Sequence, residues 1–213
     1  MTVALVQTYL AYRCFKLVRS SKDWYAVPLL IVICGIVYDN LVIGTGVFIG
    51  EGDLLKTLNI GRFVIHALFT PMIIIFALGV AKRVGVGFAQ NRIIHTVVCL
   101  SALGLIAFGF YEDIVKSVFV PVAEMGTLRY KPQASMPPIP AILTIIFTMV
   151  MGAFVSWRTR KLWFFLGPLA FFFMAPFAAK FLWVGNLGEV LMNLGLVSGE
   201  INAQNIGNDQ DVD

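Results

Sequence analysis

Charged residues inside two long apolar runs are the first candidates for chemistry. One run, 25–49, contains Asp39, and the next, 58–81, contains Arg62 and His66. Ionisable side chains are costly to place inside a membrane, so each of them is a functional candidate by default. Arg62 and His66 are spaced i, i+4, and they therefore share one face of a helix.

The register of the two runs predicts that these side chains lie at similar depth. The two helices would form an antiparallel hairpin whose connection centres near 52–54. At about 1.5 Å of rise per residue, Asp39 and His66 then differ in depth by about 3 Å, and Arg62 lies about one turn further towards the connection. Asp39, His66, Arg62 and the neighbouring Asn40 form one cluster if the two helix faces point towards each other.

Such a cluster favours acid–base chemistry, with Asp39 and His66 as the predicted catalytic residues. A carboxylate beside a histidine fixes the imidazole tautomer and stabilises the imidazolium. An arginine alongside could hold an anionic head group or a developing negative charge. Two other interpretations stay open: an ion-pair and hydrogen-bond network that only fixes helix register, and a proton or ion pathway.

The predicted substrate-binding residues all map to the half of the chain's membrane region that lies away from its basic loops. A segment between residues 111 and 138 holds several of them and is predicted to cap that side, starting with a helical extension or a re-entrant piece and ending in the proline-rich run 136–140. The predicted substrate-binding residues are Tyr38, Asn40, Arg62, Glu112, Glu124, Arg129, Tyr130 and Glu189. Because these polar residues stop about halfway across, a path through the whole membrane is disfavoured.

The composition places the chain in a membrane. Of its 213 residues, 59% are hydrophobic and only 13% are charged, whereas soluble domains carry about 25% charged residues. The mean hydropathy is +0.85. A spanning helix needs roughly 20 apolar residues. We predict an all-α bundle of six transmembrane helices, at 3–18, 25–49, 58–81, 92–110 (with continuation towards 120), 139–156 and 162–184.

Basic residues alternate between successive connections and predict an orientation. They gather in the first, third and fifth connections, which the positive-inside rule places on the cytoplasmic face. The membrane itself is predicted to be a plasma membrane, an inner membrane or an endomembrane. With six helices, both termini then lie on the non-cytoplasmic face. Residues 1–197 are predicted to form a single transmembrane domain, and the polar, acidic tail 198–213 is expected to be disordered.

Several classes of function are excluded or disfavoured. The positive charges sit in short loops, so nucleic-acid binding is not expected. The sequence has only two histidines and no CxxC, HExxH or nucleotide-binding motif, and it predicts neither a metal site nor a cofactor. Single glycines and one GxxxG spacing, Gly46 to Gly50, indicate close approach of a neighbouring helix to 25–49.

The function predicted from these residues is that of an intramembrane enzyme. It would act by acid–base chemistry on a lipid or isoprenoid-type substrate, an apolar or amphipathic small molecule, in a cavity open to the non-cytoplasmic side. The alternatives are a small transporter or channel subunit and a non-catalytic accessory subunit. The expected partners are membrane lipids, and a homo-oligomer or a larger membrane complex stays open.

Overall fold

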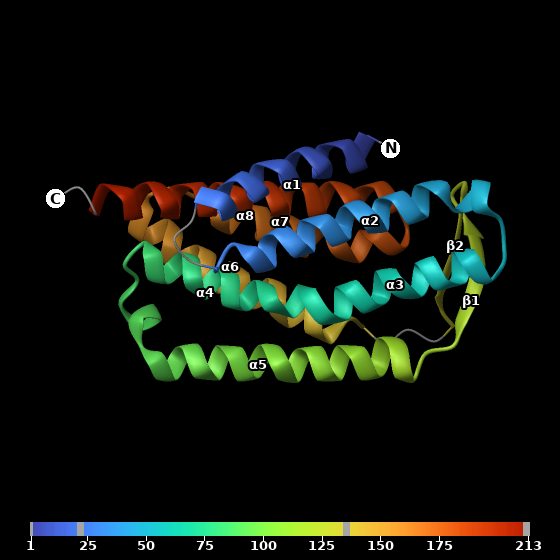
Figure 1. Cartoon of the computed structure of the whole chain (residues 1–213), viewed down its shortest axis with the longest axis horizontal. Helices are drawn as coiled ribbons and strands as arrows, with labels where there is room; N and C mark the ends of the chain where they lie inside the picture. The colour runs from blue at the N-terminus through green and yellow to red at the C-terminus, as the bar shows by residue number, and fades with distance from the viewer. Residues whose placement is uncertain (1, 21–23, 134–136, 211–213) are drawn as a thin grey trace.

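The computed structural model describes residues 2–20, 24–133 and 137–210, and 82% of it is helical. Figure 1 shows long helices lying side by side, with a small β-hairpin at one end. The α-helices are α1 Thr2–Ser20, α2 Val27–Ile49, α3 Asp53–Phe69, α4 Ile73–Arg83, α5 Arg92–Phe110, α6 Ile139–Thr159, α7 Trp163–Met174 and α8 Leu182–Gln210. The two strands are β1 Phe119–Glu124 and β2 Thr127–Pro132.

Within the described residues, four helical stretches are long and apolar enough to cross a membrane. They are Val27–Ile49, Asp53–Arg83, Arg92–Val115 and Ile139–Thr159. The second stretch joins α3 and α4 through a short 3-10 turn, Thr70–Met72. Pro71 lies in this turn and removes one backbone donor, which separates α3 from α4. The mostly helical structure is therefore consistent with the predicted membrane bundle, whereas the predicted number of six spanning helices is not confirmed.

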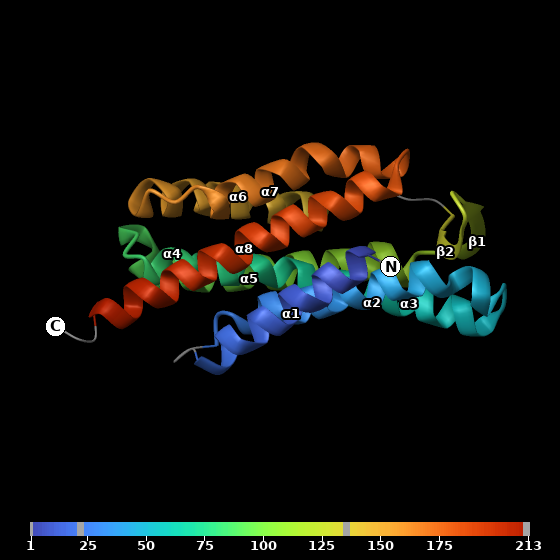
Figure 2. The ribbon, with the colours of Figure 1, turned by 90° about the horizontal axis from the view of Figure 1, so that it is seen from above.

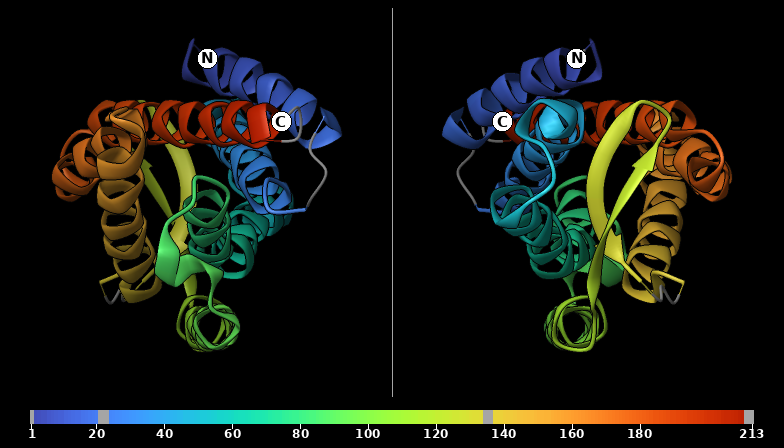
Figure 3. Two further views of the ribbon diagram at one scale, coloured as in Figure 1. Left: turned by 90° about the vertical axis from the view of Figure 1, so that its left-hand side faces the viewer. Right: turned by 90° about the vertical axis from the view of Figure 1, so that its right-hand side faces the viewer.

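The segment after α5 is a β-hairpin, which the sequence did not predict. The helix does not continue to Val120; it ends in one wide π turn, Tyr111–Val115. β1 and β2 then pair antiparallel from Phe119 opposite Pro132 to Glu124 opposite Thr127. Met125 and Gly126 both have positive φ, 50° and 73°, as a two-residue hairpin turn requires. Figure 3, right, shows the hairpin lying across one end of the bundle. Met136, at the start of the predicted proline-rich run, lies outside the described residues.

The helix predicted at 162–184 is wrong, because the chain reverses inside it. α7 ends at Met174, the 3-10 turn Ala175–Ala179 follows with Pro176 in its first turn, and α8 runs back along α7. The tail predicted to be disordered from Ser198 is instead helical as far as Gln210, the last described residue. A proline that cannot continue the helix explains the reversal.

This extra reversal places the start of α1 and the end of α8 at opposite ends of the bundle, and the predicted placement of both termini on the non-cytoplasmic face is not confirmed. α1 and α8 are parallel: Asn193 Nδ2 donates to Gln7 Oε1 at 2.9 Å, and Gln204 Nε2 donates to the Leu17 carbonyl at 3.0 Å. The C-terminal end of α8 therefore lies beside Ser20, and its start lies beside the start of α1. Figures 1 and 2 show both helices running in the same direction.

The three predicted basic connections do gather at one end, which we call the basic end. It comprises the ends of the connections at 20–27, 83–92 and 159–163 (Figure 1, left). Arg158 approaches Gly85, and Arg83 binds Glu200 near the end of α8. The opposite end, which carries the hairpin, is called the hairpin end.

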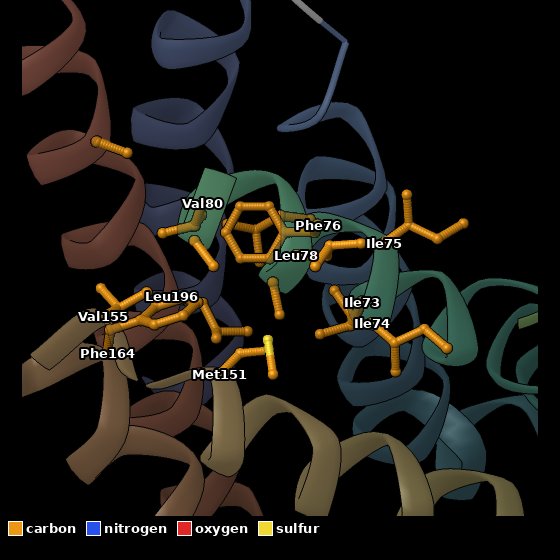
Figure 4. Close-up of a cluster of buried hydrophobic side chains, with 14 of the residues drawn as sticks. Ile73, Ile74, Ile75, Phe76, Leu78, Val80, Met151, Val155, Phe164 and Leu196 are labelled. Atoms are coloured by element: carbon orange, nitrogen blue, oxygen red, sulfur yellow. The ribbon is translucent and has the colours of Figure 1, made fainter. Parts of the chain in front are cut away.

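The main hydrophobic core surrounds α4, whose residues from Ile73 to Ala81 are all buried. Phe76 meets Phe164 of α7 edge to face, with ring centroids 6.0 Å apart, and α6 and α8 close the core with Met151 and Leu196 (Figure 4). A second, smaller core lies under the hairpin, where Phe119 and Tyr130 pack on α2 and α3. These two cores fix α2 and α3 between them, which sets the position of Asp39 and Arg62.

Close backbone contacts between helices lie between α7 and α8 and between α6 and α7, and the predicted GxxxG of α2 does not form one at Gly46. Gly46 instead faces the backbone carbonyl of Leu128 in the hairpin. On α8, a Cβ at Gly195 would stand 2.5 Å from the carbonyl oxygen of Trp163 and 3.0 Å from the Cα of Gly167. Small residues at such positions let two helix backbones approach closely in a membrane.

Replacing Gly195 by alanine is expected to lower the free energy of unfolding by about 1–3 kcal/mol. The new methyl group meets backbone atoms of α7, which cannot rotate away, so the two helices must separate. Gly104→Ala is the matched control, because its Cβ meets nothing within 4 Å on helix α5. That variant should be neutral or more stable by up to about 1 kcal/mol. Unfolding of both variants in mixed detergent micelles measures the difference; equal stability would show that α7 and α8 are not in close contact.

Candidate functional site

An ion pair joins α2 to α3 at the depth predicted from the sequence. Arg62 Nε donates to Asp39 Oδ1 at 2.6 Å, and both side chains are nearly buried. Arg62 Nη1 also donates to Asn59 Oδ1 at 2.6 Å, and Asn59 is fully buried. The guanidinium group of Arg62 therefore has fixed partners on two helices, Asp39 on α2 and Asn59 on α3. The predicted meeting of the Asp39 and Arg62 faces is present.

A second carboxylate reaches this ion pair from α8. Glu189 lies close enough to Asp39 and Arg62 to interact electrostatically with both. Its Oε2 atom is buried and has no hydrogen-bond partner among the described residues. We call Asp39, Asn59, Arg62 and Glu189 the carboxylate cluster. It places two carboxyl groups in unequal surroundings beside one guanidinium.

His66 belongs to the same face of α3 but has a different partner from the one predicted. Its Nδ1 lies 3.2 Å from Thr70 Oγ1, whereas the Asp39 carboxylate is bound by Arg62. It also borders a cavity of about 10 Å³ between α2 and α3, which is room for about one water. Asp113, in the π turn after α5, lies within electrostatic reach of His66. The predicted pairing of Asp39 with His66 is therefore absent: Asp39 pairs with Arg62, and His66 pairs with Thr70.

Two of the predicted substrate-binding residues on α2 make local contacts instead. The Tyr38 hydroxyl donates to the Leu58 carbonyl at 2.9 Å and covers Gly61. Asn40 Nδ2 donates to the Ile36 carbonyl of its own helix at 2.9 Å. The Tyr38 contact joins α2 to α3, and the Asn40 contact lies within α2.

The other predicted residues lie in or just before the hairpin and pair among themselves or with their neighbours. Glu124 accepts hydrogen bonds from Lys131 at 3.2 Å and from Arg129 at 3.3 Å, and Tyr130 is buried in the small core beneath. Glu112 pairs with the exposed Lys116 one turn later, at 3.2 Å. The hydrogen bond from Lys131, with smaller contributions from the Lys131 charge and from Arg129, holds the pKa of Glu124 below its ordinary value of 4.5.

Replacing Lys131 by methionine is expected to raise the pKa of Glu124 towards 4.5. Because the pKa is lowered in the folded protein, the stabilising contribution of this pair is complete above pH 4.5 and is lost as the pH falls through the lower, folded value. Carboxylate infrared bands of the two proteins, assigned with Glu124→Gln, would measure the shift. If both proteins titrate identically, the ion pair does not persist in solution.

Besides Glu189, which was predicted as a substrate-binding residue, α8 carries further polar residues that were not predicted as site residues. Arg83 forms a two-bond ion pair with Glu200, at 2.7 and 2.5 Å, and Glu200 is fully buried. Together with Asn193 and Gln204, the two glutamates recur at i, i+4, i+11 and i+15, one face of a helix. We call Glu189, Asn193, Glu200 and Gln204 the α8 polar stripe. Its periodicity was visible in the sequence, but the prediction of a disordered tail concealed it.

The polar stripe changes one argument made from the sequence. The polar residues do not stop halfway, since the stripe continues the carboxylate cluster to the basic end, where Gln204 contacts Leu17 and Ser20. Over the described residues, no group of three or more His, Cys, Asp or Glu side chains is arranged to hold a metal ion. The site is therefore built from ion pairs and amides.

Comparison with protein-family models and with curated proteins finds no match to this chain.

Proposed function

We propose that this chain is an intramembrane enzyme that acts on a lipid or isoprenoid-type substrate by acid–base chemistry at the carboxylate cluster. The observation that carries the proposal is Glu189, whose buried carboxyl oxygen has no partner beside the Asp39–Arg62 ion pair. Burying a charge without partners is costly, so Glu189 is suited to hold a proton that it can donate.

The neighbouring groups then have distinct roles. Two carboxyl groups whose surroundings differ can act as acid and base in one site. Asp39 fixes the guanidinium of Arg62, which stabilises a negative charge or holds a polar head group. His66, one turn further along the same helix face and hydrogen-bonded to Thr70, is the second proton-transfer group.

Access for an apolar tail is supported by α5. The stretch Arg92–Val115 is only 17% buried within the bundle, compared with 56% for Asp53–Arg83. A substrate tail would lie between α5 and α3, in the lipid-facing part of the molecule. We also propose that the basic end faces the cytoplasm, as the positive-inside rule requires, so that the hairpin covers the non-cytoplasmic side.

A lipid-turnover experiment tests the proposal. Purified protein is incubated with the total lipid extract of the membranes that produced it, and the lipids are compared by mass spectrometry. The expected result is the loss of one lipid species and the gain of a product with the wild type, and no change with His66→Ala. Unchanged lipids with the wild type, or full turnover by His66→Ala and Glu189→Gln together, would reject this site.

The α8 polar stripe favours a second candidate, a proton-conducting subunit. Buried carboxyl and amide groups from Glu189 to Gln204 connect the carboxylate cluster to the basic end. Intramembrane carboxylates in a row are typical of proton relays. Liposomes that carry the protein, a trapped pH dye and a potassium diffusion potential distinguish the candidates. Acidification that depends on Glu200 would favour conduction, whereas tight liposomes with active lipid turnover would favour the enzyme.

A further inference from the structure

A cavity lies at the basic end, away along α8 from the carboxylate cluster. It has a volume of about 90 Å³, and it lies between the ends of α6, α7 and α8. One water needs only about 10–15 Å³ on this measure, so the cavity has room for a larger group. Its walls are apolar at Val155 and Phe164 and polar at Lys161, Ser198 and Asn202.

Asn202 is the polar group that points to a ligand. It is only 6% exposed, it lines the cavity, and its side-chain amide makes no hydrogen bond with any described residue. Because no described group bonds this amide, its polar atoms are open to a partner inside the cavity. A ligand that accepts or donates hydrogen bonds inside the cavity would satisfy this amide.

The mouth of the cavity is positively charged. Arg158, Arg160 and Lys161 lie in or beside the short connection between α6 and α7, and all three are exposed. Across the described residues, no acidic side chain forms a salt bridge with any of them. The charge is therefore available to an anion, and Lys161 itself lines the cavity.

Two tryptophans place this mouth at the level of lipid head groups. Trp157 and Trp163 flank the basic connection and are 73% and 66% exposed. Tryptophan is enriched at the interface between membrane and water, where its ring meets acyl chains and its N–H meets polar groups. An anion that reaches Lys161 beside these rings would most readily be carried by a lipid.

We propose that this cavity is a binding site for the phosphate head group of an anionic phospholipid. Lys161 and the neighbouring arginines bind the phosphate, Asn202 and Ser198 hydrogen-bond the head group or glycerol, and Val155 and Phe164 receive the first part of the acyl chains. Basic pockets between transmembrane helices bind acidic lipids in this way. The lipid holds α6, α7 and α8 together at the end where Gly152 and Gly199 already bring them into contact.

Lipid binding to the purified full chain tests the inference. Delipidated protein in mild detergent is titrated with phosphatidylglycerol or with phosphatidylcholine, and bound lipid is counted by native mass spectrometry. The wild type should bind one phosphatidylglycerol at least about tenfold more tightly than phosphatidylcholine, and its Tm should rise on binding. The variant Lys161→Ala/Asn202→Leu should lose most of this difference. Lys116→Ala, an exposed lysine at the hairpin end, should keep it.

Free inorganic phosphate is the other anion that could bind the positive side chains of this cavity. Inorganic phosphate at millimolar concentration should not displace the lipid, since it cannot use the apolar wall at Val155 and Phe164. Displacement by phosphate alone would overturn the assignment to a lipid. Equal binding of both lipids by the wild type, or an unchanged preference in the double variant, would overturn the site itself. Asn202→Asp, which puts a negative charge in the cavity, should also abolish the preference if the ligand is anionic.

Discussion

Replacing Arg83 by methionine is expected to lower the free energy of unfolding by about 3–5 kcal/mol, a large fraction of the stability of an ordinary domain. Arg83 binds both oxygens of Glu200, which is fully buried on α8. Without the guanidinium, the carboxylate keeps only Gln204 as a described side-chain donor. The expected cost is therefore the penalty for a buried, unpaired charge, and chemical unfolding in mixed micelles would measure it.

The double variant Arg83→Met/Glu200→Met distinguishes this explanation from a loss of packing. Removing both charges should restore most of the stability, because apolar side chains of similar size often replace a buried ion pair at little cost. Lys116→Met is the control, since it breaks the pair with Glu112 at an exposed lysine and should change stability by less than about 1 kcal/mol. If the double variant is no more stable than the single one, the ion pair is not the cause.

Replacing Glu189 by glutamine is expected to reduce lipid turnover by about 10²–10⁴-fold, the usual contribution of a positioned acid or base. Glutamine has the same shape but cannot donate a carboxyl proton. The fold should be retained, because the buried Oε2 atom of Glu189 has no hydrogen bond to lose. The rate of product formation in the lipid-extract assay, with Tm measured on the same samples, separates the loss of chemistry from the loss of structure.

Glu51→Gln provides the matched control for this variant. Glu51 is exposed in the connection between α2 and α3, and it should keep full turnover. A Glu189→Gln protein that is as active as the wild type would remove Glu189 from the mechanism. A protein that is inactive and also less stable would show that Glu189 has a partner in solution and acts structurally.

The ion pair between α2 and α3 could be predicted because it depends on short-range information. The connection between the two helices is short, so counting residues outward placed Asp39 and Arg62 at neighbouring depths. The partner from α8 could not be placed in the same way. Glu189 reaches the cluster only because Pro176 reverses the chain, and the residues before it are apolar enough to continue a single helix.

Distant partners and ambiguous patterns also explain why the helical end of α8 and the hairpin after α5 were not predicted. The region after Ser198 is polar and acidic, which is typical of a disordered tail, but Glu200 is neutralised by an arginine that lies 117 residues earlier. Composition cannot reveal such a distant partner. The hairpin was not predicted because the valines at 118, 120 and 122 fit an apolar helix as well as a strand. The turn at Met125–Gly126 contains a single glycine, which is a weak signal for a hairpin.

The parallel contact between α1 and α8 also constrains how the chain is made. Gln7 is 186 residues away from its hydrogen-bond partner Asn193 in the sequence. During synthesis, α1 therefore enters the membrane before this bond to the Gln7 side chain can form. α1 can pack on α2 before α8 is made, but its Gln7 side chain lacks the partner on α8 until then. A ribosome that stalls before residue 193 therefore leaves the buried Gln7 side chain without its partner on α8.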